Sequence, residues 1–530
     1  MSGSEPAEST WAPLRNGVFR ALWIAVLVSN IGTWMQTVGA QWLLVHQPHA
    51  SILVALVQTA DYLPDFMFGL VGGVLADTFD RRRLLMAVQA FLVATGLALT
   101  VLTVAGQMPP ALLLIFTFLL GAGTVLTVPA YQSLVPDLVP RRQLRSASVL
   151  SSLSINLARV VGPAIAGLVI AWSGAGAVFG LTAATELVYL VVLVAWRPAA
   201  GAPPEVPERF IAALRAGGRY VRFSPIVRRI LLRATLFLVP ASALWALLPL
   251  IASQRLGQGA AGYGLLLAAL GAGAVIGAVA LGRFRGRISA NALLLGSGLI
   301  FALVLAAVAL VRNPYLVLAV LLPAGMAWMA VLSTINAELQ LFLPAWVRAR
   351  GLSVYQMVLF GSQAFAALLW GVLAAPFGLV PVFLLAAATM AAGVATMRLW
   401  PLVDTSEMDR TTARYWPDPE LVVDLDPATG PVVVSTVYTI AQDREQRFLE
   451  AMAEVRLLRL RTGGTQWGLF RDGETAHQFV ELFTVTSWDE HLRQHGERLT
   501  GTGNQIMQRA TELSNPPPET SHLIAAEVGG

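Results

Sequence analysis

Long apolar runs dominate the chain from about residue 19 to residue 400. Most are about 20 residues or longer, the length an α-helix needs to cross ~30 Å of hydrocarbon. Short turns with glycine, proline or charged residues separate them. The pattern predicts an all-α polytopic membrane protein with about twelve transmembrane helices. The expected spans are residues 19–44, 51–76, 84–105, 111–131, 146–172, 177–196, 231–253, 262–281, 290–311, 315–341, 349–374 and 379–399.

The turns between the runs alternate between arginine-rich and nearly uncharged. The chain has no lysine, so all 36 basic residues are arginines. Arg255 and Arg312 depart from the alternation. Because positive turns stay in the cytoplasm, the pattern predicts a multi-pass cell-membrane protein with both termini cytoplasmic. The arginine-rich turns are 81–83, 141–145, 197–229, 283–287 and 348–350; the uncharged ones are 46–50, 106–110, 173–177 and 376–379.

Composition narrows the class further. Of the 530 residues, 56% are hydrophobic and 13% are charged, about half the charged fraction of a soluble domain. No cysteine is present, which excludes disulfides and thiolate metal sites. A phosphate-binding P-loop needs lysine, so ATP is not expected to drive this chain. We expect no cofactor, no metal and no nucleic-acid partner; the basic turns suit lipid headgroups of the bilayer.

A long arginine-rich connection divides the expected spans six and six. The chain is therefore predicted to comprise a cytoplasmic N-terminus (1–18), a six-helix lobe (19–197), a linker (198–229) and a second six-helix lobe (230–400). This is the organisation of a two-lobed transporter. Within the linker, an amphipathic segment predicts an interfacial helix on the cytoplasmic leaflet. Its apolar residues are Phe210, Ile211, Leu214 and Val221.

After Trp400 the sequence becomes charged and soluble in character. Following a linker (401–429), residues 430–530 read as a ferredoxin-like α+β domain. The expected order is a strand at 432–440, a helix at 443–461, a hairpin of 466–470 with 478–487, a helix at 488–499 and a strand at 522–527.

A glycine, an aspartate and a basic run lie between the second and third expected spans: Gly73, Asp77, Arg81, Arg82 and Arg83. This pattern resembles the loop signature of the major facilitator superfamily. The resemblance to that superfamily covers roughly residues 15–400. It departs at Thr78, where a basic residue is usual, and at Asp80, where glycine is usual. The resemblance implies a gating loop; the alternative is an ordinary cytoplasmic turn.

A second signal lies in the fifth span, where Gly162 and Pro163 are followed by Gly167. Together with the stretch 129–137, it resembles the superfamily branch that contains siderophore and macrolide efflux proteins. Proline removes a backbone donor and glycine allows close helix contact, so we expect a bend here. A simple packing kink is the alternative.

Charged residues lie well inside three of the expected spans, away from their ends: Asp61, Asp65, Arg159 and Glu186. Charge inside a membrane is costly and is by default a functional hypothesis. Counting 1.5 Å per residue places Asp65, Arg159 and Glu186 at similar depth. We therefore expect Arg159 to pair with Asp65 or Glu186, either as part of proton coupling or as a static pair that fixes packing.

Polar residues of the first span are candidates for a substrate cavity, because this span lines the pathway in the superfamily that the chain resembles. They could equally form interhelical hydrogen bonds. In the fourth span, Thr117 stands where the superfamily's proton antiporters have arginine, which weakens the case for proton coupling. The cavity candidates are Asn30, Thr33, Trp34, Gln36 and Thr37, with Asn336 in the tenth span.

The tail, over residues 430–515, resembles the antibiotic-biosynthesis-monooxygenase-like branch of dimeric α/β barrels. The stretches 461–467, 479–483 and 487–495 carry this resemblance. It implies a dimerising or ligand-sensing module. We expect His491 and His495 at the surface of a helix, and no catalytic residues.

These observations favour a secondary active exporter of an amphipathic small molecule such as a siderophore, antibiotic or drug, driven by protons through alternating access. Two alternatives stay open. One is an importer of the same fold. The other is a membrane-tethered sensor or cofactor-free oxygenase that works through the tail.

Overall fold

The computed structural model describes residues 9–196, 217–284, 287–405, 408–411, 413 and 426–525, without the side chains of 70–78 and 284. These residues form two compact units. The first takes in the described residues of Met1–Pro207, Leu232–Ile335 and Tyr355–Pro401. The second takes in those of Glu208–Leu231, Asn336–Val354 and Leu402–Gly530. Phe210, Ile211 and Leu214 of the expected interfacial helix lie outside the described residues.

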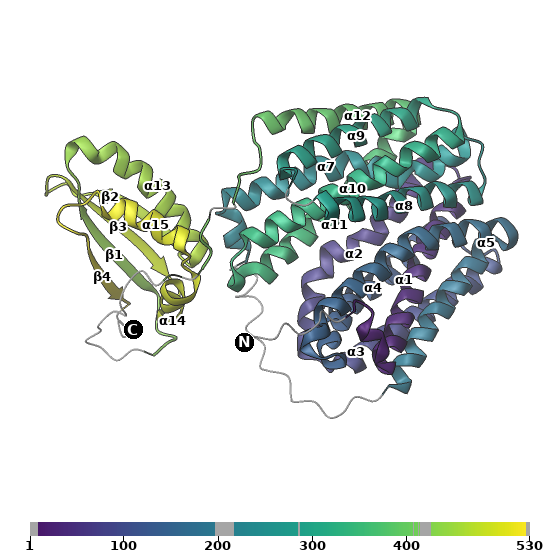
Figure 1. Ribbon diagram of the computed structural model, residues 1–530, viewed down its shortest axis with the longest axis horizontal. Helices are drawn as coiled ribbons and strands as arrows, with labels where there is room; N and C mark the ends of the chain where they lie inside the picture. Colours follow the sequence, from purple (N-terminus) through teal and green to yellow (C-terminus); the bar gives the residue numbers. More distant parts are fainter. Residues whose placement is uncertain are drawn as a thin grey trace. The chain divides into compact units, whose positions relative to one another are not determined.

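Long helices make up the apolar part of the chain (Figure 1). Within the described residues, ten are long and apolar enough to cross a membrane. The structure is thus mainly helical, as expected. The helices are α1 (Gly17–Leu44), α2 (Ala50–Thr78), α3 (Arg81–Val104), α4 (Pro110–Leu138), α5 (Leu144–Ala195), α7 (Pro225–Leu250), α8 (Ala260–Phe284), α9 (Ala290–Leu310), α10 (Pro314–Phe342), α11 (Ala345–Phe377) and α12 (Leu379–Ala395).

Helix α5 joins two expected spans into one assigned helix of 52 residues. Its backbone leaves the helical region at Gly174, with φ 77° and ψ 174°. This left-handed φ suits glycine, which has no Cβ to clash. The helix continues through Pro163, so the chain changes direction at Gly174 and the bend expected at the proline is not where the helix breaks.

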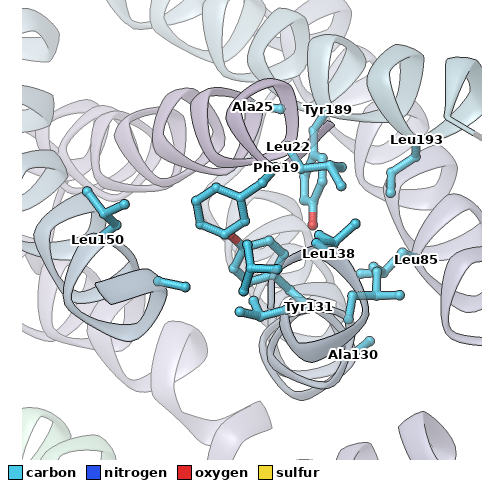
Figure 2. Packing of buried hydrophobic residues seen from close by; sticks show 14 residues of the cluster. Phe19, Leu22, Ala25, Leu85, Ala130, Tyr131, Leu138, Leu150, Tyr189 and Leu193 are labelled. Carbon is cyan, nitrogen blue, oxygen red and sulfur yellow. The ribbon is translucent and has the colours of Figure 1, made fainter. Parts of the chain in front are cut away.

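One apolar core lies among α1, α3, α4 and α5 (Figure 2). Phe19 and Tyr189 are fully buried in it, and Tyr131 of α4 packs beside them. The periodic apolar faces of these helices meet here, which holds the N-terminal helices together and fixes the depth of the polar residues described below.

Among α7, α9 and α10, buried aromatic rings form a second core. Trp328 lies 5.3 Å from Trp245 and 5.9 Å from Phe237, measured between ring centroids. Phe301 lies 5.2 Å from Phe237. Such tilted ring pairs contribute to packing beyond the area that they bury.

The tail forms a four-stranded antiparallel sheet in the order β2-β3-β1-β4. Its elements are β1 (Val432–Thr439), α13 (Glu445–Thr462), β2 (Gln466–Arg471), β3 (Gln478–Val485), α14 (Trp488–Arg493), α15 (Gly501–Thr511) and β4 (Glu519–Ile524). The four expected strands are present in the expected order, as are the helix expected at 443–461 and the helix expected to begin at residue 488. The sequence reading had missed α15 and placed the last strand a few residues late.

Candidate functional site

A polar cleft lies within the N-terminal helices and brings together residues of α1, α2, α3, α4 and α5. Two of the intramembrane carboxylates, those of Asp61 and Glu186, line it. The sequence had placed Glu186 level with Asp65 and Arg159 instead. The lining residues are Thr33, Gln36, Asp61, Leu92, Gly96, Leu120, Gly121, Thr124, Thr182, Ala183 and Glu186.

Each carboxylate of the cleft is held by a hydroxyl group of α1. Ser29 Oγ lies 2.9 Å from both carboxylate oxygens of Glu186. Thr37 Oγ1 donates to Asp61 Oδ2 at 3.3 Å. Neither carboxylate has an ion pair within 4.0 Å among the described residues. Glu186 is 5% exposed and Asp61 is partly buried. A carboxylate that is shielded from water and has no cation beside it is costly when charged, so these two groups are suited to hold protons.

Close helix packing positions Asp61. A Cβ added to Gly121 of α4 would lie 2.9 Å from the backbone carbonyl oxygen of Asp61, so only glycine lets α2 and α4 approach this closely. One turn earlier on α4, Thr117 is fully buried and accepts a hydrogen bond from Gln36 Nε2 at 3.4 Å. The threonine that replaces the expected arginine therefore belongs to the polar network beside the cleft.

Arg159 does not form the expected ion pair in this structure. Glu186 is bonded to Ser29, and no described carboxylate lies within 4.0 Å of the Arg159 guanidinium. The guanidinium instead lies 5.6 Å from the ring centroid of Trp34 on α1. Asp65 lies outside the cleft lining. The structure therefore separates Asp61 and Glu186, which share a cleft, from Arg159.

Glycines of the span-five motif hold α5 against its neighbours. A Cβ on Gly162 would lie 2.7 Å from Trp34 Cβ. A Cβ on Gly167 would lie 2.6 Å from the Ala260 carbonyl oxygen and 3.1 Å from Gly264 Cα. Helix α5 thus touches α1 on one side and α8 on the other, and the motif acts at the contact between N-terminal and C-terminal helices.

Part of the expected gating loop is described. The side chain of Asp77, and any contact of Gly73, lie outside the described residues. Arg81 forms an ion pair with Asp137 of α4 at 3.2 Å. Arg82 donates to the carbonyl oxygens of Leu193 and Val194 at 2.9 and 3.0 Å. These arginines tie α3 to the ends of α4 and α5, and cation contacts at a helix C-terminus are favourable.

The departure from the loop signature has a local role. Asp80, where the family has glycine, is the N-cap of α3. Its side chain accepts the backbone N–H of Arg83 at 2.8 Å. A side-chain cap of this kind satisfies a helix-end donor.

Several cavity candidates are engaged by neighbouring residues. Asn30 donates to Ser154 at 3.0 Å, and Gln340 donates to Asn336 at 3.0 Å. Thr33 lines the cleft but donates to the Ser29 carbonyl oxygen at 3.2 Å. Asn30 therefore forms an interhelical hydrogen bond, whereas Thr33 and Gln36 line the cleft.

A contact not foreseen from the sequence joins α1 and α8 near the uncharged turn 46–50. Tyr263 Oη donates to Gln41 Oε1 at 2.5 Å, and its ring stacks on Trp42 at 5.9 Å. On the same side, Thr59 of α2 donates to the Ala364 carbonyl oxygen of α11 at 2.8 Å. An isolated tyrosine in an apolar run gives no sign of such a partner in sequence.

The expectation that His491 and His495 lie at a helix surface was wrong, because His491 is buried and His495 is partly buried. His491 is 1% exposed, and its ring lies 4.5 Å from His495 and 4.7 Å from His522 of β4. Burial, followed by the neighbouring imidazoles and Arg459, lowers the pKa of His491 to about 2. Burial and Arg459 lower the pKa of His495 to about 3. In the described residues, no group of His, Asp and Glu has the geometry to hold a metal ion.

Beside these histidines, a polar network is sealed between the sheet and α13. Glu481 is fully buried and pairs with Arg459 at 3.2 Å. Trp467 Nε1 and Tyr438 Oη donate to its two oxygens at 2.9 and 3.1 Å. Every oxygen of this carboxylate is thus satisfied, which is what a buried ion pair requires to be tolerated. The only sign of this buried network in the sequence is that Glu481 lies between apolar residues of a strand.

The tail also contacts other segments of the second unit. Arg498 bonds both oxygens of Glu490, and its guanidinium lies 4.8 Å from the ring centroid of Trp346 on α11. Arg219 donates to Glu490 at 3.3 Å. These contacts lower the pKa of Glu490 despite its burial.

A family model described as "Transmembrane secretion effector" matches residues 8–529, which is nearly the whole chain and includes the tail. The chain belongs to this family of the major facilitator superfamily. It is therefore a multi-pass membrane protein of a transport family, and its relatives point to efflux.

Curated relatives agree with this family. The chain is 31% identical over 320 residues to a protein named enterobactin exporter EntS from Escherichia coli O1:K1 / APEC, covering 60% of this chain and 75% of that one. It is 32% identical over 268 residues to the protein of that name from Shigella boydii serotype 4, covering 50% of this chain and 63% of the relative.

Solved structures show the same fold at low identity. A bacterial homologue of the human lysosomal transporter Spinster, in an inward-facing and unoccupied conformation, matches with a TM-score of 0.57 at 17% identity. The match covers 75% of this chain and 96% of that one. The POT family transporter PepTSo matches with a TM-score of 0.59 at 12% identity, and the match covers 73% of this chain and 97% of that one. These matches show a transporter fold for the helical part.

Proposed function

We propose that this chain is a proton-coupled exporter of an amphipathic small molecule, either a siderophore, an antibiotic or a drug. Its helices cross the cell membrane twelve times as two six-helix lobes. Helix α5 supplies two of these crossings, one on each side of Gly174. Both termini face the cytoplasm, as the arginine-rich turns require. The lobes rock about a midplane site in alternating access.

The observation that carries proton coupling is the shared position of Asp61 and Glu186. Both line one cleft, and each is held by a hydroxyl and by no cation among the described residues. Hydroxyls can donate to a carboxylate and accept from a carboxylic acid, so each site accommodates both protonation states. Helix α1, which supplies both hydroxyls, also carries the Gln41 contact to α8. Protonation and the movement of α1 are thereby linked.

The direction of transport is supported by the family and by the relatives named as exporters. Importing proteins share this fold, as the D-xylose–proton symporter does at a TM-score of 0.57. The proposal is tested with the purified full chain in proteoliposomes carrying an imposed pH gradient. Enterobactin serves as a probe because the relatives are named for it, and ethidium serves as an unrelated amphipathic probe.

Export requires that at least one probe move against its gradient in the direction opposite to the proton flow. Flux of both probes only in the direction of proton flow identifies an importer. A chain lacking residues 404–530 tests the tail. If flux survives in this shortened chain, the helices carry out transport. If flux is normal but no longer changes in response to a probe, the tail has a sensing role.

A further inference from the structure

Two side-chain donors meet a shared tryptophan at the contact between N-terminal and C-terminal helices. The Arg159 guanidinium of α5 lies 5.6 Å from the Trp34 ring of α1. On the other side, the Trp245 ring of α7 lies 6.0 Å from Trp34. Trp245 is 7% exposed. Three helices from both parts of the transporter therefore converge on Trp34.

Both donors lack an acceptor within the part of the chain that the structure describes. Arg159 Nε and Trp245 Nε1 are buried and have no hydrogen-bond partner among the described residues. Arginine and tryptophan side chains only donate. Leaving such a donor buried and unpaired is costly, so these sites are expected to be completed by an acceptor from outside the chain.

Among the described residues, no carboxylate forms an ion pair with Arg159. Glu186 is bonded to Ser29, Asp61 is bonded to Thr37, and Asp65 forms no ion pair with Arg159. An arginine buried without a counter-ion favours an anion, and its planar fork matches a carboxylate or a pair of adjacent oxygens.

The surroundings of these donors are aromatic. Trp328 lies 5.3 Å from Trp245, and Tyr62 of α2 lies 5.6 Å from Phe360 of α11 between the same two sets of helices. Flat rings favour stacking with another ring, and the arginine adds a cation–π partner at Trp34. A ligand that suits all of these features is aromatic, anionic and rich in acceptors.

We propose that Arg159 Nε and Trp245 Nε1 bind the anionic, acceptor-bearing aromatic group of the cargo, beside Trp34. This inference rests on the proposed transport function and names the chemical class of its substrate. Because α1 and α5 contribute on one side and α7 on the other, the ligand would bridge the moving parts. A ligand can shift a conformational equilibrium only through contacts that differ between the two states, and a bridge of this kind supplies them.

Binding to the full chain in lipid nanodiscs tests the proposal by calorimetry. The probes are salicylate, an aromatic carboxylate with an adjacent hydroxyl, and salicylamide, its uncharged counterpart. We expect wild-type protein to bind salicylate at least ~10-fold more tightly, which corresponds to about 1.4 kcal/mol. Arg159→Gln should remove that preference, and Arg159→Lys should retain part of it because charge persists without the fork.

Trp245→Phe keeps the ring and removes the donor, and should weaken salicylate about 3- to 10-fold, the range of a lost neutral hydrogen bond. Arg255→Gln is the matched control, because Arg255 also has a buried Nε without a partner but lies in the segment Ile251–Arg255, away from Trp34. It should leave both probes unchanged.

Equal binding of the two probes, or salicylate binding that survives both Arg159→Gln and Trp245→Phe, overturns the proposal. Displacement of salicylate by equimolar chloride also overturns it, since the site would then hold a simple anion. If Arg159→Gln does not fold, Trp245→Phe with the two probes decides. If the Arg159→Gln chain still transports the probe with an unchanged KM, this inference is contradicted but the transport proposal is not. If the chain binds salicylate specifically but transports no probe, the transport proposal is contradicted but this inference is not.

Discussion

Ser29 Oγ lies 2.9 Å from each carboxylate oxygen of Glu186, and this contact joins α1 to the last part of α5. One hydroxyl proton is shared by two oxygens, so the carboxylate is oriented but not neutralised. The same helix holds Asp61 through Thr37 at 3.3 Å. Movement of α1 would therefore change the surroundings of both acidic groups together.

Neutralising either cleft carboxylate should uncouple export from the proton gradient. We expect Asp61→Asn and Glu186→Gln to lower proton-driven efflux at least ~10-fold, the loss that follows when a proton carrier is removed. Exchange of labelled for unlabelled probe without a gradient should persist, because it needs no net proton movement. Efflux and exchange in proteoliposomes measure the two.

Asp65→Asn is the matched control, since Asp65 lies one helical turn from Asp61 but outside the cleft lining. It should reduce driven efflux by less than ~3-fold. A larger loss in Asp65→Asn than in Asp61→Asn would contradict the assignment of coupling to the cleft.

The alternation of charge and the apolar runs were sufficient to predict the helical class, because membrane insertion is decided by composition over about 20 residues. Six of the seven tail helices and strands were predicted from their periodicity, and α15 was missed because its glycine-rich start, Gly501 and Gly503, suggests a loop. Which side chains contact one another could not be predicted in the same way. Depth counted along helices placed Arg159 level with Glu186, but depth says nothing about which way a side chain points around the helix axis.

Likewise, the sequence showed that Asp61 and Glu186 are unusual but not that they share a cleft. That proximity depends on α2 and α4 approaching at Gly121, a contact between residues about 60 positions apart in the chain. For the tail, His491, His495 and His522 are spread over α14, the short π-helix Gln494–Arg498 and β4, and only the fold of the sheet brings His522 to the others.

Removing the buried carboxylate of the tail should destabilise that domain strongly. Glu481→Gln leaves Arg459 buried without its counter-ion, and breaking a buried pair costs about 3–5 kcal/mol. Hydrogen exchange of the β1 and β3 amides in the full chain measures the change. Glu454→Gln, which removes the exposed pair with Arg509, is the control and should cost under ~1 kcal/mol. Similar exchange in both variants would show that the Glu481 network does not stabilise the sheet.

Acid should weaken the tail through its buried histidines. Their folded-state pKa values, about 2 for His491 and about 3 for His495, lie below the ordinary 6.5, so the unfolded chain binds more protons between these limits. Stability is therefore full above pH 6.5 and is lost as the pH falls toward 3. From pH 7.5 to 5.5 each histidine should cost about 1.4 kcal/mol.

Hydrogen exchange of β1 and β4 amides at the two pH values, corrected for intrinsic exchange rates, measures this loss. His491→Asn should flatten the dependence, while His477→Asn, on an exposed turn, should not change it. Acid-independent stability of the wild-type sheet would contradict burial of neutral imidazoles.

The most direct test of alternating access uses the Tyr263–Gln41 contact, which joins α8 to α1. The chain has no cysteine of its own, so Gln41→Cys with Tyr263→Cys gives a unique pair for a short, reducible bifunctional thiol reagent. Cross-linking should lower efflux to under ~10% of the untreated value, and reduction should restore it, because the two sets of helices must separate here during transport. Each single-cysteine chain, treated alike, should keep its flux. Undiminished efflux from the fully cross-linked chain would contradict the account.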